Sequence, residues 1–192
     1  VTAFVDTIRA AGWSNSLGQK ALQLLGPGVP DIYQGTELWD LSLVDPDNRR
    51  PVDFDVRTEL LTRLETGWRP PVDDTGAAKL HLVRTCLRTR KELAPEGHLP
   101  LSASGSAADH VLAFARTSTV EAATEDAPEH DGPGTLARHP DLVVVTTRLP
   151  ITLAELGGWH DTVLPLPSGP GTWVDRLTGR PLTPDRADGF TV

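Results

Sequence analysis

The 192-residue chain has no methionine, only one cysteine, and few aromatic residues, which make up 5% of it. The lone cysteine, Cys86, excludes a disulfide within the chain and is typical of a reducing cytoplasm. Its helical pattern with Val83 and Leu87 favours a buried, unreactive thiol. No apolar stretch approaches the roughly 18 residues needed to span a bilayer, so we predict no transmembrane helix.

Acidic residues outnumber basic ones. The chain has 18 Lys and Arg and 26 Asp and Glu, which gives a net charge of −8. This balance argues against nucleic acid or an anionic membrane as the partner and is compatible with a neutral polar substrate. The first ten residues lack the basic-then-apolar layout of a signal peptide. The chain instead opens inside an apolar helical face (Phe4, Val5, Ile8) with no capping residue before it, which indicates a piece of a longer polypeptide.

The first third of the sequence predicts helix, helix and strand, the order of an α/β unit. Gly12 interrupts the first helix, and Ser16 with Gln19 has the spacing of a capping box that begins the second. Residues 26–28 then end the helical pattern, and the apolar run 29–33 suits a buried strand. A long polar loop follows over residues 34–54, and loops of this length are often functional.

The middle of the chain predicts two more helices, and its last half predicts strands. One helix covers about residues 56–66, and another begins after residue 75 with Leu80, Val83 and Leu87 on one face. Strands are expected at 110–116, 142–147 and 173–175, with a turn at 177–180. The acidic, Pro- and Gly-rich stretch at about 118–140 between them predicts a mobile loop. The expected core of this β module is Val111, Phe114, Val143, Val145 and Trp173.

The loop after residue 33 is rich in groups that bind sugars. Forked polar side chains bridge neighbouring sugar hydroxyls, and aromatic rings pack on the C–H face of the sugar. In a (β/α)₈ barrel, the loops that follow the strands form the active-site face. The candidate forks are Asp45, Asp47, Asn48, Arg49 and Arg50, and the candidate aromatic faces are Tyr33 and Trp39.

Residues 27–37 resemble the eighth barrel strand of α-amylase superfamily enzymes, Pro-Gly-x-Pro-x-Ile-Tyr-x-Gly-x-Glu. The segment Leu-x-Asp-Pro-Asp-Asn-Arg-Arg-Pro-Val-Asp at 43–53 is similar to the form found in maltooligosyltrehalose synthases, and 111–116 and 173–180 resemble the C-terminal β module of that family. The resemblance implies an α+β chain in which residues 1–95 are the last helix–strand–helix part of a (β/α)₈ barrel. Residues 96–192 would then form a small antiparallel β-sandwich.

The family converts the reducing-end α-1,4 linkage of maltooligosaccharides into an α,α-1,1 linkage by a retaining transfer, in which one carboxylate forms a glycosyl-enzyme and a second carboxyl group acts as acid and then base. Its three catalytic acids lie on earlier barrel strands, so the resemblance assigns no catalytic residue here. It implies a maltooligosaccharide as substrate and the N-terminal part of the same enzyme as partner. The single cysteine predicts a cytoplasmic location, and the residues themselves support neither a cofactor nor a metal site. The substrate-binding residues that the resemblance implies are Tyr33, Gln34, Asp45, Asp47, Asn48, Arg49 and Arg50.

Simpler interpretations of these residues stay open. Asp45, Asp47 and Asn48 are also common turn formers, with arginines that pair with them to hold the loop. Glu37 matches a mostly structural residue of the superfamily, and aromatic residues such as Trp39 pack more often than they bind sugar. No metal-binding spacing, nucleophile elbow or phosphate-binding loop occurs.

Two other functions compete with the glucan mutase. The chain could come from a hydrolytic amylase or another trehalose-forming enzyme that shares the strand motif, or it could be a separate module that binds glucan or protein. A barrel strand at 29–33 without its neighbours would expose an apolar edge. We therefore expect the isolated chain to self-associate there or to keep its first ~50 residues loosely ordered.

Overall fold

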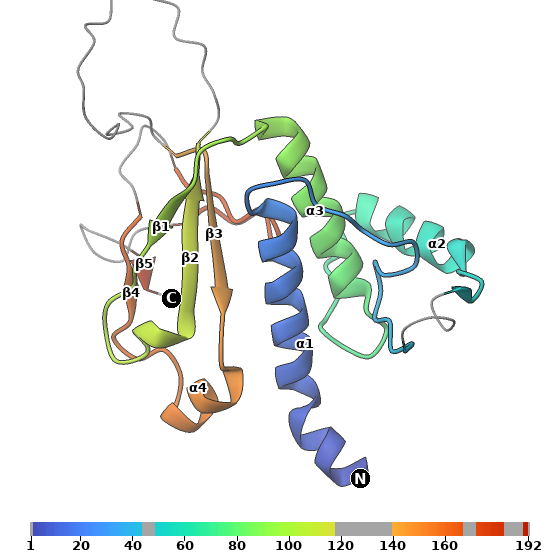
Figure 1. Ribbon diagram of the computed structural model, residues 1–192, viewed down its shortest axis with the longest axis horizontal. Coiled ribbons are helices and arrows are strands. Elements are labelled where there is room, and N and C mark those ends of the chain that lie inside the picture. Colours follow the sequence, from blue (N-terminus) through green and yellow to red (C-terminus); the bar gives the residue numbers. More distant parts are fainter. Residues whose placement is uncertain (1, 44–48, 118–139, 167–171, 183–189, 192) are drawn as a thin grey trace, which may run out of the picture.

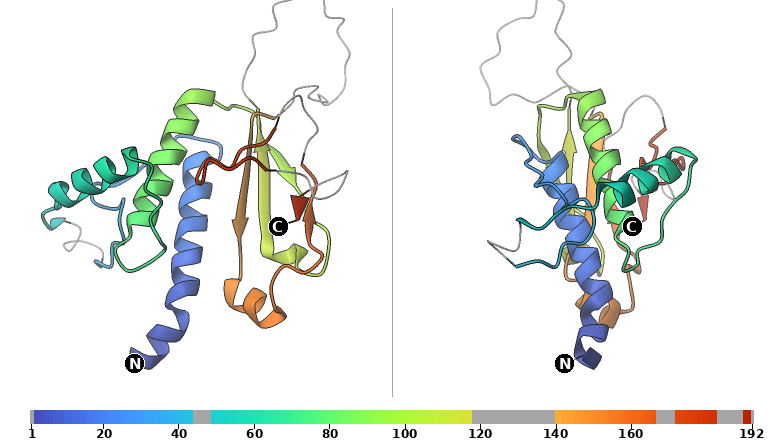
Figure 2. Two further views of the ribbon diagram at one scale, coloured as in Figure 1. Left: turned by 180° about the vertical axis from the view of Figure 1, so that it is seen from behind. Right: turned by 90° about the vertical axis from the view of Figure 1, so that its right-hand side faces the viewer.

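The structure is a computed structural model that describes residues 2–43, 49–117, 140–166, 172–182 and 190–191. It is an α+β arrangement in which helices lie beside a small antiparallel sheet (Figure 1). Helix α1 packs against strand β3 on one side and helix α3 on the other, while α2 contacts α3 at the edge far from the sheet. The view from behind shows the same order (Figure 2).

Helix α1 runs without a break from Thr2 to Leu25, so the predicted interruption at Gly12 is wrong. A glycine inside a helix costs only about 1 kcal/mol relative to alanine, which the residues on either side outweigh. Ser16 therefore lies inside the helix and does not begin one. Helix α1 lies close to the sheet at Gly18, where a Cβ would make ordinary contact with the Thr146 Cβ at 3.5 Å.

The predicted strand at 29–33 is also wrong, since these residues form irregular chain. A strand is stabilised by hydrogen bonds to neighbouring strands. Among the described residues every strand begins at Leu99 or later, and none pairs with 29–33. Val29 is consequently 96% exposed.

Helices α2 (Phe54–Glu65) and α3 (Ala77–Leu93) confirm the two helices predicted in the middle of the chain. Asp53 caps α2, where its carboxylate accepts a 3.0 Å hydrogen bond from the Val56 amide. On α3, Leu80 and Val83 are buried as expected, but Leu87 is 38% exposed. The short helix α4 (Pro150–Leu156) was not expected from the sequence pattern.

The strands form two small antiparallel sheets. β1 (Leu99–Leu101), β2 (Val111–Arg116) and β3 (Leu142–Thr147) form one in that order, with the 3₁₀ turn η2 (Ala108–His110) before β2. β4 (Val163–Leu164) pairs with β5 (Phe190–Thr191) in the other. The strands predicted at 110–116 and 142–147 are confirmed. The one predicted at 173–175 is wrong, because only an isolated bridge joins Val174 to Pro181 there.

The main core lies between the helices and the three-stranded sheet. It brings together Leu24 of α1, Val83 of α3, Phe114 of β2 and Val144 of β3. Phe114 was expected in the core, but Val145 was placed there wrongly and is 45% exposed. The other members of the expected core, Val111, Val143 and Trp173, are only partly buried.

The exposure of Val145 has a simple cause in the pleat of β3. Successive side chains alternate between the two faces of a strand. Helix α1 covers the face that carries Leu142, Val144 and Thr146, and these three residues are buried. The sequence alternation is equally apolar at the odd positions, so only the docking of α1 decides which face is inside.

Candidate functional site

A hollow of about 390 Å³ lies beside the loop that joins α1 to α2. Its walls come from residues 33–42 on the outgoing limb of the loop and residues 50–53 on the returning limb, with Arg57 from the first turns of α2. Its polar side chains are those of Tyr33, Gln34, Asp40, Ser42, Arg50, Asp53 and Arg57, with the Trp39 indole beside them. Hydroxyl, carboxylate and guanidinium groups next to an aromatic ring are the chemistry that sugars require.

The structure brings three of the seven predicted substrate-binding residues together. Tyr33, Gln34 and Arg50 all line the hollow, and each is exposed to solvent. Arg49 is exposed but is not part of the wall. The other three, Asp45, Asp47 and Asn48, lie outside the described residues, so their predicted role stays a prediction.

Asp40 and Ser42 line the hollow and were not singled out from the sequence. One carboxylate oxygen of Asp40 accepts hydrogen bonds from the Ser42 hydroxyl at 2.5 Å and the Ser42 amide at 2.9 Å. The bond from the hydroxyl, followed by that from the amide, lowers the pKa of Asp40 from its ordinary value. The carboxylate is therefore ionised at neutral pH, so it is a hydrogen-bond acceptor in the wall of the hollow. An Asp-x-Ser pattern in a polar loop was the available signal.

Glu37 has a structural contact in this site. Its carboxylate lies 3.1 Å from the Nε of Arg57, and both side chains are mostly buried. The pair connects the loop to α2, in agreement with the structural interpretation of Glu37. The sequence analysis did not identify Arg57, because the residues around an arginine on a helix surface do not indicate which distant residue it will contact.

Trp39 makes contacts with three other residues, Trp13, Asp73 and Lys79. Its ring stacks on that of Trp13 in α1 at 6.0 Å and 6°. Its indole N–H donates to the Asp73 carbonyl at 2.7 Å, and the Lys79 ammonium lies 5.7 Å from the ring centre. These contacts favour a packing role for Trp39, which fastens the outgoing limb of the loop to α1 and α3.

Lys79 supports the same attachment from α3. Its ammonium donates to the Leu38 carbonyl at 2.9 Å. Burial, followed by repulsion from Lys20, lowers the pKa of Lys79 from its ordinary value. The side chain is only 7% exposed, so its single charge is directed at the loop backbone and away from solvent.

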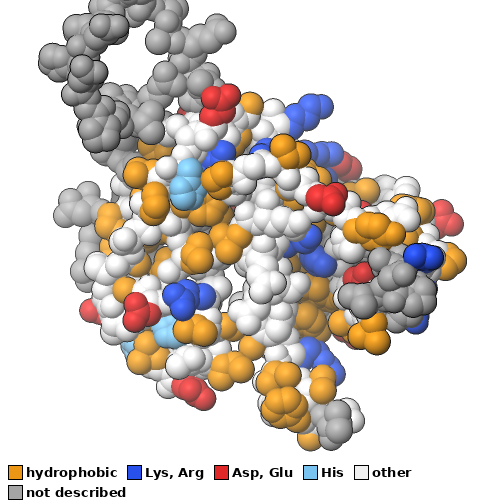
Figure 3. Space-filling model, in the orientation of Figure 1, with side chains coloured by type: hydrophobic (Ala, Val, Ile, Leu, Met, Phe, Trp, Pro, Cys, Tyr) orange, Lys and Arg blue, Asp and Glu red, His pale blue; other side chains and the backbone are white. Residues whose placement is uncertain are grey.

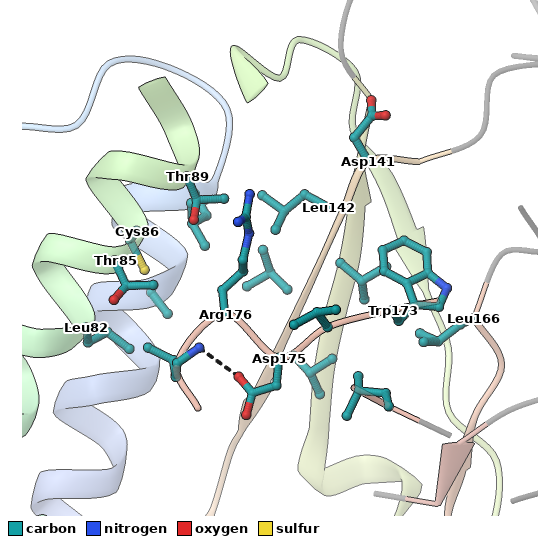
Figure 4. A pocket seen from close by; sticks show the side chains of 18 of the residues that line it. Leu82, Thr85, Cys86, Thr89, Asp141, Leu142, Leu166, Trp173, Asp175 and Arg176 are labelled. Atoms are coloured by element: carbon teal, nitrogen blue, oxygen red, sulfur yellow. Dashed lines mark hydrogen bonds between the residues drawn. The ribbon is translucent and has the colours of Figure 1, made fainter. Parts of the chain in front are cut away.

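A larger hollow of about 610 Å³ lies between the helices, β3 and residues 172–182. Figure 4 shows Leu82, Cys86 and Thr89 of α3 on one side and Trp173 and Leu166 on the other. Burial raises the pKa of the Cys86 thiol to about 12, so this thiol is unreactive. The mainly apolar lining makes this hollow a poor match for a sugar.

Among the described residues, no three His, Cys, Asp and Glu side chains gather in a way that could hold a metal ion. Within the same ranges, no helix is long and apolar enough to cross a membrane.

No protein-family model matches the chain. A Mycobacterium tuberculosis (strain H37Rv) protein named as a maltooligosyl trehalose synthase is 39% identical over 184 residues, which is 93% of this chain and 19% of that protein. The chain thus spans about a fifth of the length of the curated relatives that it matches.

Solved structures give the same result. The maltooligosyltrehalose synthase of Arthrobacter ramosus matches with a TM-score of 0.79 and 44% identity, over 99% of this chain and 22% of that one. Another structure of a maltooligosyl trehalose synthase matches with a TM-score of 0.60 and 26% identity, over 94% of this chain and 21% of the other.

Proposed function

This chain is homologous to one part of the maltooligosyltrehalose synthases, and we propose that it contributes the outer wall of the glucan site in an enzyme of that activity. The enzyme would convert the reducing-end α-1,4 linkage of a maltooligosaccharide into an α,α-1,1 linkage, giving a maltooligosyltrehalose in trehalose biosynthesis. The observation that carries the proposal is the hollow whose wall includes Tyr33, Gln34 and Arg50. The 44% identity to a maltooligosyltrehalose synthase of solved structure supports it.

We place the catalytic carboxyl groups outside this chain. A retaining transfer needs a nucleophile and an acid/base about 5–5.5 Å apart. The carboxylates around the described hollow have other partners, because Glu37 pairs with Arg57, Asp53 caps α2 and Asp40 accepts two bonds from Ser42. The chain would therefore bind and orient glucan and leave the bond exchange to acids of the remaining polypeptide.

The proposal includes a barrel part and a β domain. Residues 1–95 would be the last part of a (β/α)₈ barrel. Residues 96–192 would form the C-terminal β domain, with the acidic insertion at about 118–140. We also place the enzyme in the cytoplasm, where the single cysteine stays reduced.

The proposal is tested by incubating the chain with maltopentaose while following reducing ends and chain length together. We expect neither quantity to change, since both catalytic acids are absent. The same assay on the enzyme that contains this chain should remove reducing ends while the number of glucose units is kept. New reducing ends would instead identify a hydrolytic amylase. A loss of reducing ends with the isolated chain would contradict the placement of the catalytic acids.

A second test concerns the exposed apolar residues around the hollow and along α1. Large apolar side chains are exposed near both ends of α1, at Phe4 (66% exposed) and Val29 (96%), and in the loop and the start of α2, at Leu41 (93%), Leu43 (76%) and Phe54 (56%). Figure 3 shows hydrophobic side chains gathered at the N-terminal end of α1. Exposed apolar side chains that gather on a protein surface are often covered by another part of the protein. We propose that the remaining part of the enzyme covers these side chains and that the isolated chain self-associates through them.

Size-exclusion chromatography with light scattering measures this association. We expect the mass to rise with protein concentration, and we expect the double variant Phe4→Ser, Val29→Ser to shift the mass towards that of the monomer. The matched control is Leu156→Ser on α4, whose side chain is similarly apolar and 43% exposed. A monomer at every concentration would rule out self-association.

A further inference from the structure

Arg57 occupies the place where the two limbs of the 35–53 loop come together. Its guanidinium donates to the Gly35 carbonyl at 2.5 Å and pairs with the Glu37 carboxylate at 3.1 Å, both on the outgoing limb. It also donates to the Asp53 carbonyl on the returning limb at 2.8 Å. One side chain thus closes the loop through three different nitrogens.

The two limbs are packed closely at this position, which we call the loop neck and define as Gly35, Glu37, Val52, Asp53 and Arg57. A Cβ built on Gly35 would lie 2.9 Å from the Val52 Cγ2, so the outgoing backbone is in contact with the returning side chain. Gly35 has a φ of +88°, which an ordinary side chain rarely adopts. The Arg57 side chain is only 15% exposed at this point.

The chemistry of the contact requires arginine. A guanidinium is planar, has five N–H donors in fixed directions and stays charged at all working pH values. A lysine ammonium has its three N–H donors on one nitrogen, so it can replace the pairing with Glu37 but cannot reach the three acceptors that the guanidinium contacts from three separate nitrogens. Because the contacts of Arg57 with Gly35 and Glu37 are partly buried, hydrogen bonds from the charged group are worth more there than in water.

We propose that Arg57 is a positioning residue that sets how the two loop limbs face each other across the 390 Å³ hollow. The outgoing limb carries Tyr33, Gln34 and Asp40, and the returning limb carries Arg50. Neither limb alone forms the hollow, so their relative position determines which sugar hydroxyls can be reached at once. The claim that the hollow binds a maltooligosaccharide rests on the proposed function, whereas the positioning of the limbs does not.

The test compares Arg57→Lys with the unchanged chain by hydrogen exchange and by titration with maltopentaose followed by NMR. We expect amides of residues 36–43 to exchange roughly tenfold faster, since a net hydrogen bond to a charged group is lost at each limb. Exchange in α3 and the midpoint of thermal unfolding should stay unchanged, because the main core is elsewhere. Maltopentaose affinity should fall by a similar factor.

Two further variants separate geometry from charge. Arg63→Lys is the matched control, because Arg63 is on the same helix but its guanidinium lies over the Trp68 ring at 3.8 Å, away from the neck. It should leave exchange in 36–43 unaltered. Glu37→Gln keeps an oxygen acceptor for Arg57 and should have a clearly smaller effect than Arg57→Lys.

The possible outcomes are distinguishable. Unchanged exchange in 36–43 after Arg57→Lys overturns the positioning role, whatever the glucan data show. If amide exchange becomes faster but the affinity for maltopentaose stays unaltered, in a chain that binds maltopentaose, then Arg57 does not determine glucan binding. Faster exchange in a chain that never binds maltopentaose keeps the positioning of the limbs and counts against the proposed function of the hollow.

Discussion

Replacing Arg116 with methionine should lower the free energy of unfolding by about 2–4 kcal/mol, measured by chemical denaturation. Arg116 is 2% exposed at the end of β2 and donates to the carbonyls of Leu25, Pro95 and Gly97. Methionine fills a similar volume but cannot donate, so three carbonyl groups would lose a donor. Burial, followed by repulsion from Arg90, lowers the pKa of Arg116 from its ordinary value without removing its charge.

This large effect follows from the position of Arg116 at the C-terminal end of α1. The last carbonyls of a helix lack partners within the helix and carry a partial negative charge. Arg116 bonds to the Leu25 carbonyl at 2.6 Å, and Arg90 of α3 bonds to those of Leu24 and Gly26 at 3.0 Å each. Two cations from other elements therefore end this helix and fix its direction against the sheet.

A matched arginine shows whether burial is the cause. Arg176→Met removes a side chain that is 44% exposed and pairs with Glu92 on the surface. An exposed ion pair contributes about 0–1 kcal/mol, so this variant should unfold nearly as the unchanged chain does. Equal losses in both variants would contradict the explanation, as would a loss under about 0.5 kcal/mol at Arg116.

Gly76→Ala should cost about 2–4 kcal/mol and release the outgoing limb of the loop from α3. Gly76 caps α3 with a φ of +74°, where alanine is strained. The added Cβ would also lie 2.6 Å from the backbone nitrogen of Trp39, so the backbone of one partner must move. Denaturation gives the stability change, and faster exchange of the amides at 38–40 reports the local release.

Gly12→Ala is the control for this variant and should have the opposite sign. Gly12 lies inside α1, and a Cβ there would meet nothing within 4 Å. Alanine in an exposed helix interior is favoured over glycine by about 0.5–1 kcal/mol. If Gly76→Ala proved neutral, the contact between Gly76 and Trp39 would not hold the loop.

The site could be predicted from the sequence only in part. The polar composition of the loop and its resemblance to a known segment indicated Tyr33, Gln34 and Arg50, which now line one hollow. Arg57 and Asp40 were missed because their roles depend on contacts. For Arg57 the partners are on the other limb of the loop, up to 22 residues away. Nothing in a helical pattern specifies such a partner.

The sequence by itself determined the elements whose signals are local. Helices α2 and α3 follow from apolar spacing, β2 follows from the alternation of its residues, and β3 follows from its β-branched apolar residues, because such patterns act within a few residues. The resemblance to maltooligosyltrehalose synthases likewise needed only the order of residues 27–53.

Tertiary structure alone decided the features that depend on neighbours. Residues 29–33 are apolar enough for a strand but form none, because no described strand lies beside them. Val144 is buried and Val145 is exposed because α1 covers one face of β3. The contacts of Arg116 and Arg57 also depend on tertiary structure. A guanidinium group withdrawn from solvent is stable only where several carbonyl or carboxylate oxygens surround it, and the fold brings these oxygens together.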